Sequence, residues 1–140
     1  METAERPLVI VDAANTVGSV PDGWWRDRHG AAERLRDRLV RVAAEGLPPA
    51  RNVPEWAVNT PVDVVLVVEG AARNVESVPG IRVEPASGSG DDRIVEVAQE
   101  ASGRRTLVIT SDRELRRRVA EHGAAYAGPR AVRPEAREKD

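Results

Sequence analysis

Five carboxylates stand where apolar runs give way to polar residues. Asp12 directly follows four aliphatic residues, Glu69 and Asp112 follow two later apolar runs, and Asp91 and Asp92 open a helical pattern behind a Gly/Ser loop. Carboxylates gathered in one place repel each other, and a hard divalent cation such as Mg²⁺ or Mn²⁺ relieves this by taking oxygen ligands. Such an ion can activate water and neutralise a phosphodiester transition state. The residue types therefore indicate metal-dependent phosphoryl chemistry, with hydrolysis as its simplest form.

The intervening pattern predicts that these carboxylates share one edge of a sheet. The continuous apolar run at residues 8–11 is typical of a strand buried on both faces, and further strands are expected at 62–68 and 106–110. Two shorter strands are expected at 81–84 and 124–127, and helices at 31–45, 71–77, 91–102 and 111–122. This alternation predicts an α/β fold with a mostly parallel sheet of four to five strands and helices on both faces. Such sheets place their sites beyond the carboxyl ends of the strands.

Each acidic residue also has an ordinary structural interpretation. An Asp in the first turn of a helix stabilises the dipole and caps free N–H groups, and a Glu-Gly pair is a common turn. The shared edge favours the functional interpretation, and Asp12 carries it best because it follows four aliphatic residues so abruptly. The predicted catalytic and metal-binding residues are Asp12, Asp91, Asp92 and Asp112, with Glu69 as a further metal ligand.

Polar, basic and aromatic neighbours are candidates for substrate binding. Asn15 and Ser111 are each either a helix cap, with Ser111 in capping-box spacing to a later Glu, or a contact for phosphate. Trp25 beside Arg26 either stacks a base above bound phosphate or anchors a helix or a dimer contact. Arg113 belongs to an arginine cluster that either is a solvated face or guides a polyanion. The predicted substrate-binding residues are Asn15, Ser111, Arg113, Trp25 and Arg26.

Several other chemistries lack a required residue. The only lysine is Lys139, near the chain end, which excludes a P-loop and a receiver-type phosphoacceptor. A phosphoaspartate phosphatase needs an acid where Ala14 stands, and no G-x-S-x-G elbow exists. The glycines at 88 and 90 lack the third glycine of a dinucleotide fingerprint. The absence of cysteine excludes disulfides and thiolate zinc sites, and two histidines are too few for a histidine-built one.

Composition limits the class of protein. The 140 residues, 41% hydrophobic and 31% charged, suit one globular domain. The formal net charge of −2 excludes a polycation that coats nucleic acid by bulk electrostatics. No apolar stretch suits a membrane helix or a signal peptide, so we expect a cytoplasmic protein with no membrane partner. We expect one domain over residues 1–127 and a flexible charged tail over residues 128–140.

Three sequence blocks resemble a known family. Residues 9–15 (VIVDAAN), 88–95 (GSGDDRIV) and 108–115 (VITSDREL) look, in this order, like an NYN domain. That family belongs to the PIN-like nucleases and includes the YacP-like bacterial branch. The resemblance covers roughly residues 8–126. It implies a three-layer α/β/α fold, an acidic pocket for Mg²⁺ or Mn²⁺ and single-strand-selective ribonuclease activity. It also implies that Asp12, Asp91 or Asp92, and Asp112 hold the metal, with Asn15 and Ser111 in support.

The leading hypothesis is a metal-dependent endoribonuclease acting on single-stranded or structured RNA, with a homodimer as a further expectation. Two alternatives use the same fold. One is a non-catalytic RNA- or protein-binding module, which the slight net acidity and the near absence of lysine favour. The other is a small metal-dependent phosphatase or nucleotide hydrolase that uses the same acidic pocket.

Overall fold

The computed structural model describes residues 5–136, and in this part of the chain the strands form one five-stranded sheet. All four strand pairings are parallel, in the order β3-β2-β1-β4-β5. The strands are β1 (Leu8–Asp12), β2 (Asp63–Val68), β3 (Ile81–Pro85), β4 (Thr106–Ile109) and β5 (Ala125–Ala127). The predicted α/β class and parallel sheet are confirmed.

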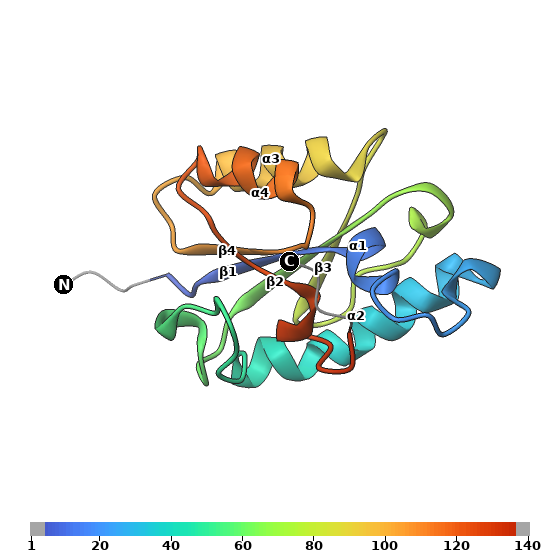
Figure 1. The fold of residues 1–140 in the computed structure, drawn as a ribbon, viewed down its shortest axis with the longest axis horizontal. Helices are drawn as coiled ribbons and strands as arrows, with labels where there is room; N and C mark the ends of the chain where they lie inside the picture. Colours follow the sequence, from blue (N-terminus) through green and yellow to red (C-terminus); the bar gives the residue numbers. More distant parts are fainter. Residues whose placement is uncertain (1–4, 137–140) are drawn as a thin grey trace.

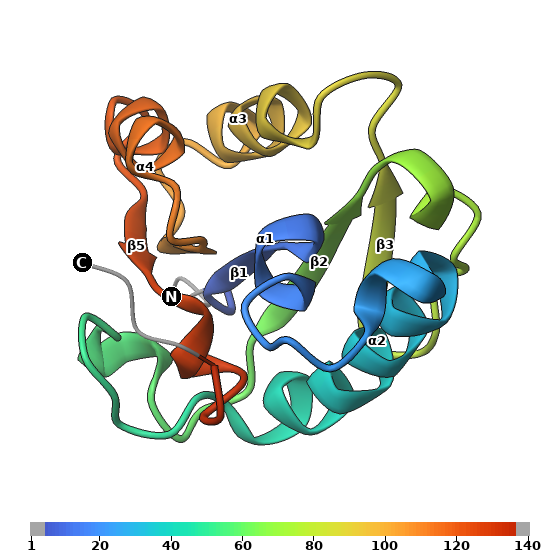
Figure 2. The same ribbon diagram turned by 45° about the vertical axis from the view of Figure 1, so that its right-hand side comes forward.

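Helices cover both faces of the sheet and give three layers (Figure 1). α2 (Arg28–Glu45) lies along one face, and the short α1 (Ala13–Val17) packs against it directly after β1. α3 (Gly90–Glu100) and α4 (Arg113–Ala120) lie side by side over the other face, as Figure 2 shows. This arrangement explains why residues 8–11 of β1 and 64–68 of β2 are all apolar, since neither face of the sheet meets water there.

Alternate residues of β1 enter two separate cores. Val9 and Val11 belong to the cluster beneath α2, whereas Leu8 and Ile10 belong to the cluster beneath α3 and α4. Burial of one such aliphatic side chain stabilises the fold by about 1.5–3 kcal/mol. β1 is therefore fixed from both sides, and its last residue, Asp12, is held in a rigid place.

The strand order sets the position of the site. β1 is the central strand, paired with β2 on one side and β4 on the other. The chain passes through α2 on one face on its way from β1 to β2, and through α3 on the other face on its way from β3 to β4. In such sheets a crevice opens at the carboxyl ends of the two strands where the direction of winding changes. Those strands are β1 and β4, so the ends at Asp12 and Thr110 meet there.

Two segments differ from the sequence prediction. The helix expected at 71–77 is only a 3₁₀ turn, η3 (Gly70–Ala72), because Ala72 and Val75 alone bury apolar surface there. The segment after residue 127, expected to be a charged tail outside the domain, instead forms a 3₁₀ turn, η4 (Pro129–Ala131), whose Ala131 enters the core beneath α2. Val132 is buried beside it. The described residues through Ala136 thus pack as part of the domain, and residues 137–140 lie outside the described residues.

Over residues 5–136, no helix combines the length and the apolar character needed to cross a membrane.

Candidate acidic site

Asp12 lies where β1 ends and α1 begins, beside the carboxyl end of β4. Its Oδ1 accepts a hydrogen bond from the Asn15 backbone N–H at 3.3 Å, which caps the helix, and its Oδ2 accepts one from the Thr110 hydroxyl at 2.9 Å. The residue is only 5% exposed. Burial raises the pKa of Asp12 to about 6, although both hydrogen bonds favour the ionised form, and Asp91 and Glu69 add to the rise.

Thr110 joins Asp12 to Asp112. The Thr110 hydroxyl donates to Asp12 and accepts a hydrogen bond from the Asp112 backbone N–H at 3.2 Å. Oδ1 of Asp112 accepts from the Leu115 N–H at 2.9 Å and so caps α4. The cap expected at Ser111 is therefore at Asp112, because Ser111 is turned to another partner. Sequence reasoning missed Thr110, whose only signal was a hydroxyl at the last position of the predicted strand 106–110.

The hydrogen-bond partner of Ser111 is the side chain of Asn15. Its Oδ1 accepts hydrogen bonds from both the backbone N–H and the hydroxyl of Ser111, at 2.9 and 3.1 Å. These bonds tie the start of α1 to the turn that precedes α4. Because a backbone N–H can only donate, the amide oxygen of Asn15 must face Ser111, and the NH₂ group points away from it. No described residue accepts a hydrogen bond from that NH₂ group.

The two adjacent acids of α3 have different surroundings. Ser89 caps the helix by accepting from the Asp91 N–H at 3.1 Å. Asp91 is half-buried, and this burial, followed by the charges of Asp112, Glu69 and Asp92, raises its pKa against the opposing charge of Arg118. Asp92 is exposed and forms a 3.0 Å ion pair with Arg118 of α4. Asp91 is therefore the α3 carboxylate that interacts with the rest of the acidic group.

Glu69 reaches the same group through a gap left by a glycine. A Cβ atom added to Gly90 would lie 2.5 Å from Oε1 of Glu69, so the carboxylate lies against the first turn of α3. Its charge acts on both Asp12 and Asp91. The sequence pattern gave Glu69 the weakest support, and its position depends on a residue 21 positions later that has no side chain.

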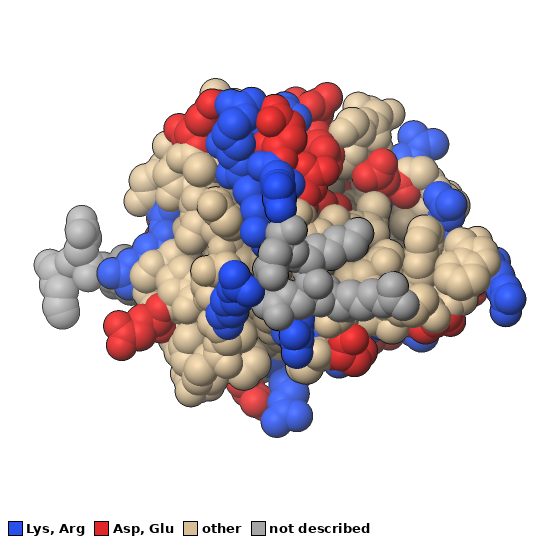
Figure 3. All heavy atoms as spheres, in the orientation of Figure 1, with Lys and Arg blue, Asp and Glu red and all other residues tan. Residues whose placement is uncertain are grey.

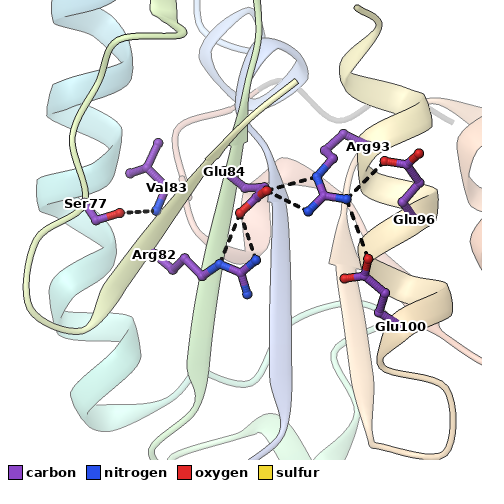
Figure 4. Close-up of polar contacts among 7 residues, drawn as sticks. All are labelled: Ser77, Arg82, Val83, Glu84, Arg93, Glu96 and Glu100. Atoms are coloured by element: carbon purple, nitrogen blue, oxygen red, sulfur yellow. Dashed lines mark hydrogen bonds and ion pairs between the residues drawn. The ribbon is translucent and has the colours of Figure 1, made fainter. Parts of the chain in front are cut away.

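An ion-pair network fixes α3 against the edge strand β3 (Figure 4). Arg93 donates to Glu84 at 2.6 and 3.1 Å and also pairs with Glu96, while Arg82 donates to the other Glu84 oxygen at 2.8 Å. Burial disfavours ionisation of Glu84, but the bonds from Arg93 and Arg82 outweigh it and lower the pKa of this carboxyl. Arg93 follows Asp91 by two residues, so the network holds the N-terminal turn of α3 in place.

The acidic site thus consists of four interacting carboxylates: Asp12, Glu69, Asp91 and Asp112. Figure 3 shows acidic side chains gathered at the top of the molecule beside a column of basic side chains over α4. Within residues 5–136, no three acidic or histidine side chains are arranged to hold one metal ion together. The carboxylates therefore form an electrostatic group rather than a preformed cage.

The predicted basic and aromatic residues lie on α4 and in the 3₁₀ turn η1 (Trp24–Arg26). Arg113 follows Asp112 at the start of α4, and its guanidinium forms no ion pair with residues 5–136. Arg116, one turn later, donates to the Thr110 carbonyl at 2.9 Å and covers the Tyr126 ring at 4.9 Å. On the α1 side, Trp25 is 51% exposed and Arg26 lies 5.7 Å from its ring centroid.

Comparisons with known proteins identify the fold. No model of a known family matches the chain, and no curated protein matches it by sequence. The crystal structure of a mutant of Rae1 (YacP) from Bacillus subtilis matches with a TM-score of 0.68, covering 91% of this chain and 72% of that one. This chain shares the fold of Rae1. The two sequences are 18% identical, so the match to Rae1 extends to architecture alone. Rae1 carries the YacP name of the family branch that the three sequence blocks resemble.

Proposed function

We propose that this chain is a metal-dependent ribonuclease that cleaves single-stranded RNA at the acidic site. The observation that carries the proposal is the grouping of Asp12 and Asp112, which follow β1 and β4, with Asp91 at the start of α3, whose charge interacts with both. The Rae1 fold and the NYN-like order of the three sequence blocks support it. Without a counter-charge, this group of carboxylates is unfavourable, and phosphodiester cleavage needs such a counter-charge.

The donor set fits Mg²⁺ or Mn²⁺. Mg²⁺ usually keeps several waters and takes one or two carboxylates, so it does not need three preplaced side chains. Asp12 and Asp91 would hold the ion directly, since their charges interact and burial disfavours ionisation of both. Asp112 and Glu69 would contact its waters. The ion would supply an activated water and charge neutralisation at the phosphate.

The remaining residues would bind and orient the strand. Thr110 holds Asp12 in one rotamer by its hydrogen bond, and Ser111 fixes the side chain of Asn15 at the start of α1. Arg113 would receive the phosphate that leads into the site from the α4 side. Arg26 would extend the path on the other side by pairing a phosphate, with the exposed ring of Trp25 beside it. Asp92, already paired with Arg118, would act on Asp91 only through its charge.

The test is cleavage of a labelled, unstructured RNA with Mn²⁺, with Mg²⁺ and with EDTA. We expect cleavage with either metal, none with EDTA, and a loss of at least about 100-fold in Asp12→Asn, Asp91→Asn and Asp112→Asn. Asp37→Asn, at an exposed position of α2, is the matched control and should cleave normally. Cleavage that survives Asp12→Asn would contradict the proposal.

The lack of a preformed three-ligand set favours one other candidate, a non-catalytic RNA-binding module on the same fold. It predicts RNA binding without turnover in any metal. Free nucleotides, assayed beside the RNA, separate a third candidate, a metal-dependent phosphatase or nucleotide hydrolase, because that enzyme would release phosphate from nucleotides and leave the RNA intact.

A further inference from the structure

A pocket of about 330 Å³ adjoins the acidic site on the α1 side. Its walls include Ala14 and Gly18 of the α1 segment, Trp24, Pro129 and the linked pair of Asn15 and Ser111. Drug-sized ligand sites run from about 300 to 1,000 Å³, so this pocket suits one small ring system.

Two segments that line the pocket or adjoin its lining also hydrogen-bond to Asp12. Asn15 lines it, and the backbone N–H of the same residue donates to Asp12 at 3.3 Å. Ser111 also lines it and directly follows Thr110, whose hydroxyl donates to Asp12 at 2.9 Å. Asn15 on one side and the segment 110–111 on the other therefore lie between a group in the pocket and the Asp12 carboxylate. In a nucleotide, a base and its phosphate are separated by one ribose, which matches this arrangement.

The walls combine an aromatic surface with a polar rim. Trp24 is held before any ligand arrives, because Arg28 lies 5.3 Å from its ring centroid and Trp25 meets it edge-on at 5.8 Å. On the rim, the Asn15 NH₂ group is a fixed donor, since its oxygen is taken by Ser111. A flat ring with hydrogen-bond acceptors on its edge, such as every nucleobase has, matches both features.

Gly18 keeps the pocket open. A Cβ atom added there would lie 3.7 Å from Cζ2 of Trp24 and 3.1 Å from the Ala14 carbonyl oxygen. Gly18 has φ −71°, which any residue adopts, so the backbone conformation does not require glycine here. What the missing side chain provides is the space between α1 and the indole ring.

We propose that this pocket binds an unpaired nucleobase of the RNA strand whose phosphate lies at the acidic site, with Trp24 as the stacking surface and Asn15 as the hydrogen-bond donor. The proposal rests on the proposed function for the direction of the strand. It assigns to Trp24 a base contact that the sequence pattern assigned to Trp25.

The test measures binding separately from cleavage. Asp12→Asn serves as the parent protein, because it removes a central carboxylate and the expected cleavage. The probes are a short labelled single-stranded RNA and the same strand without bases, measured by fluorescence anisotropy. We expect the baseless strand to bind about tenfold or more weakly than the RNA. Competition by a nucleoside monophosphate shows whether a free nucleotide alone occupies the pocket.

Two variants remove the pocket in different ways. Trp24→Ala removes the stacking surface, and Ala14→Leu fills the pocket from an exposed helical position without touching the core. Both should bind the RNA as weakly as the baseless strand. Trp56→Ala and Ala120→Leu are the matched controls, since Trp56 packs on the same core at the opposite edge of the sheet and Ala120 is exposed on α4. Both controls should keep the difference between the strands.

The proposal is overturned if the parent binds both strands equally, or if Ala14→Leu keeps full preference for the bases. If Trp24→Ala does not fold, Ala14→Leu alone decides. Base-dependent binding combined with no metal-dependent cleavage by the wild type would remove the proposed ribonuclease and leave the pocket standing. Metal-dependent cleavage without base-dependent binding would overturn the base pocket and leave the proposed ribonuclease standing.

Discussion

The Thr110 hydroxyl donates a 2.9 Å hydrogen bond to Oδ2 of Asp12, and both residues are buried. The two lie 98 positions apart in the sequence, at the ends of neighbouring strands. The bond favours the charged form of the Asp12 carboxyl group, whereas burial and the charges of Asp91 and Glu69 favour its neutral form. It therefore helps to orient Asp12 and partly offsets the rise that burial causes in its pKa.

Loss of the Thr110 hydroxyl should weaken the fold and make Asp12 a weaker acid. We expect Thr110→Val to lower the free energy of unfolding by about 1–2 kcal/mol, because a buried acceptor loses its donor. Thr16→Val is the matched control: the Thr16 hydroxyl is buried without a hydrogen-bond partner among the described residues, so its removal should be neutral or stabilising. Urea denaturation of both variants checks this, and equal losses would contradict it.

Asp12→Asn should stabilise the metal-free protein at neutral pH. Folding raises the pKa of Asp12 from 3.8 to about 6, so the neutral carboxyl favours the folded state. This contribution is complete below about pH 4 and is lost as the pH rises through about 6. In EDTA, the variant should therefore exceed the wild type by about 2–3 kcal/mol at pH 7 and by little at pH 4. If the free energies of unfolding of the two proteins differ by the same amount at pH 4 and pH 7, burial does not disfavour the charged form of Asp12.

Divalent ions should offset the stability that the wild type loses when the buried Asp12 ionises. If Asp12 and Asp91 hold the ion, Mn²⁺ at a hundred times its Kd should stabilise the folded state by about 2.7 kcal/mol. Thermal melts with and without Mn²⁺ measure the shift. Asp91→Asn should lose most of it, whereas Asp37→Asn should keep it. An unchanged shift in Asp91→Asn would place the ion elsewhere.

Gly90→Ala tests Glu69 without removing its charge. The new Cβ would displace Oε1 of Glu69, the mobile end of a side chain, while alanine improves the helix by up to about 1 kcal/mol. We expect a protein of equal or higher stability with weaker Mn²⁺ binding in a calorimetric titration. Glu69→Gln should weaken binding in the same direction. Normal Mn²⁺ affinity in both variants would exclude Glu69 from the metal site.

Arg93→Gln should loosen α3 from β3. The change leaves Glu84 with Arg82 alone, and we expect a loss of about 1 kcal/mol at neutral pH because the pair is only partly shielded from water. The lowered pKa of Glu84 means that its ion pairs stabilise the fold above the ordinary carboxyl pKa and stop doing so as the pH falls. The stability gap between wild type and variant should therefore shrink in acid. A gap that is constant down to low pH would indicate a packing effect instead.

The order of elements and the acidic edge could be predicted from the sequence, because both depend on local patterns. Four aliphatic residues before Asp12 indicate a buried strand, and a parallel sheet brings its strand ends together. The sequence could not separate Asp91 from Asp92, since the ion pair to Arg118 connects two helices that are distant in the chain. It could not separate Trp24 from Trp25 either, because the pocket walls come from α1 and η4 as well. The packing of residues 129–136 was not predicted, because the charged residues around Ala131 and Val132 indicated an exposed tail, whereas both are buried.

The central place of β1 has a consequence for the order of events during synthesis. β1 emerges from the ribosome first among these strands, yet each paired residue of β1 meets a β4 partner that is made 98 residues later. Until then β1 has an open edge, of the kind that recruits other strands. The carboxylate of Asp12 is translated early, but Thr110, Asp112 and Asn15's partner Ser111 arrive only near the end. A growing or truncated chain therefore carries the central acid without the residues that orient it, and the site is assembled only when almost the whole domain has been made.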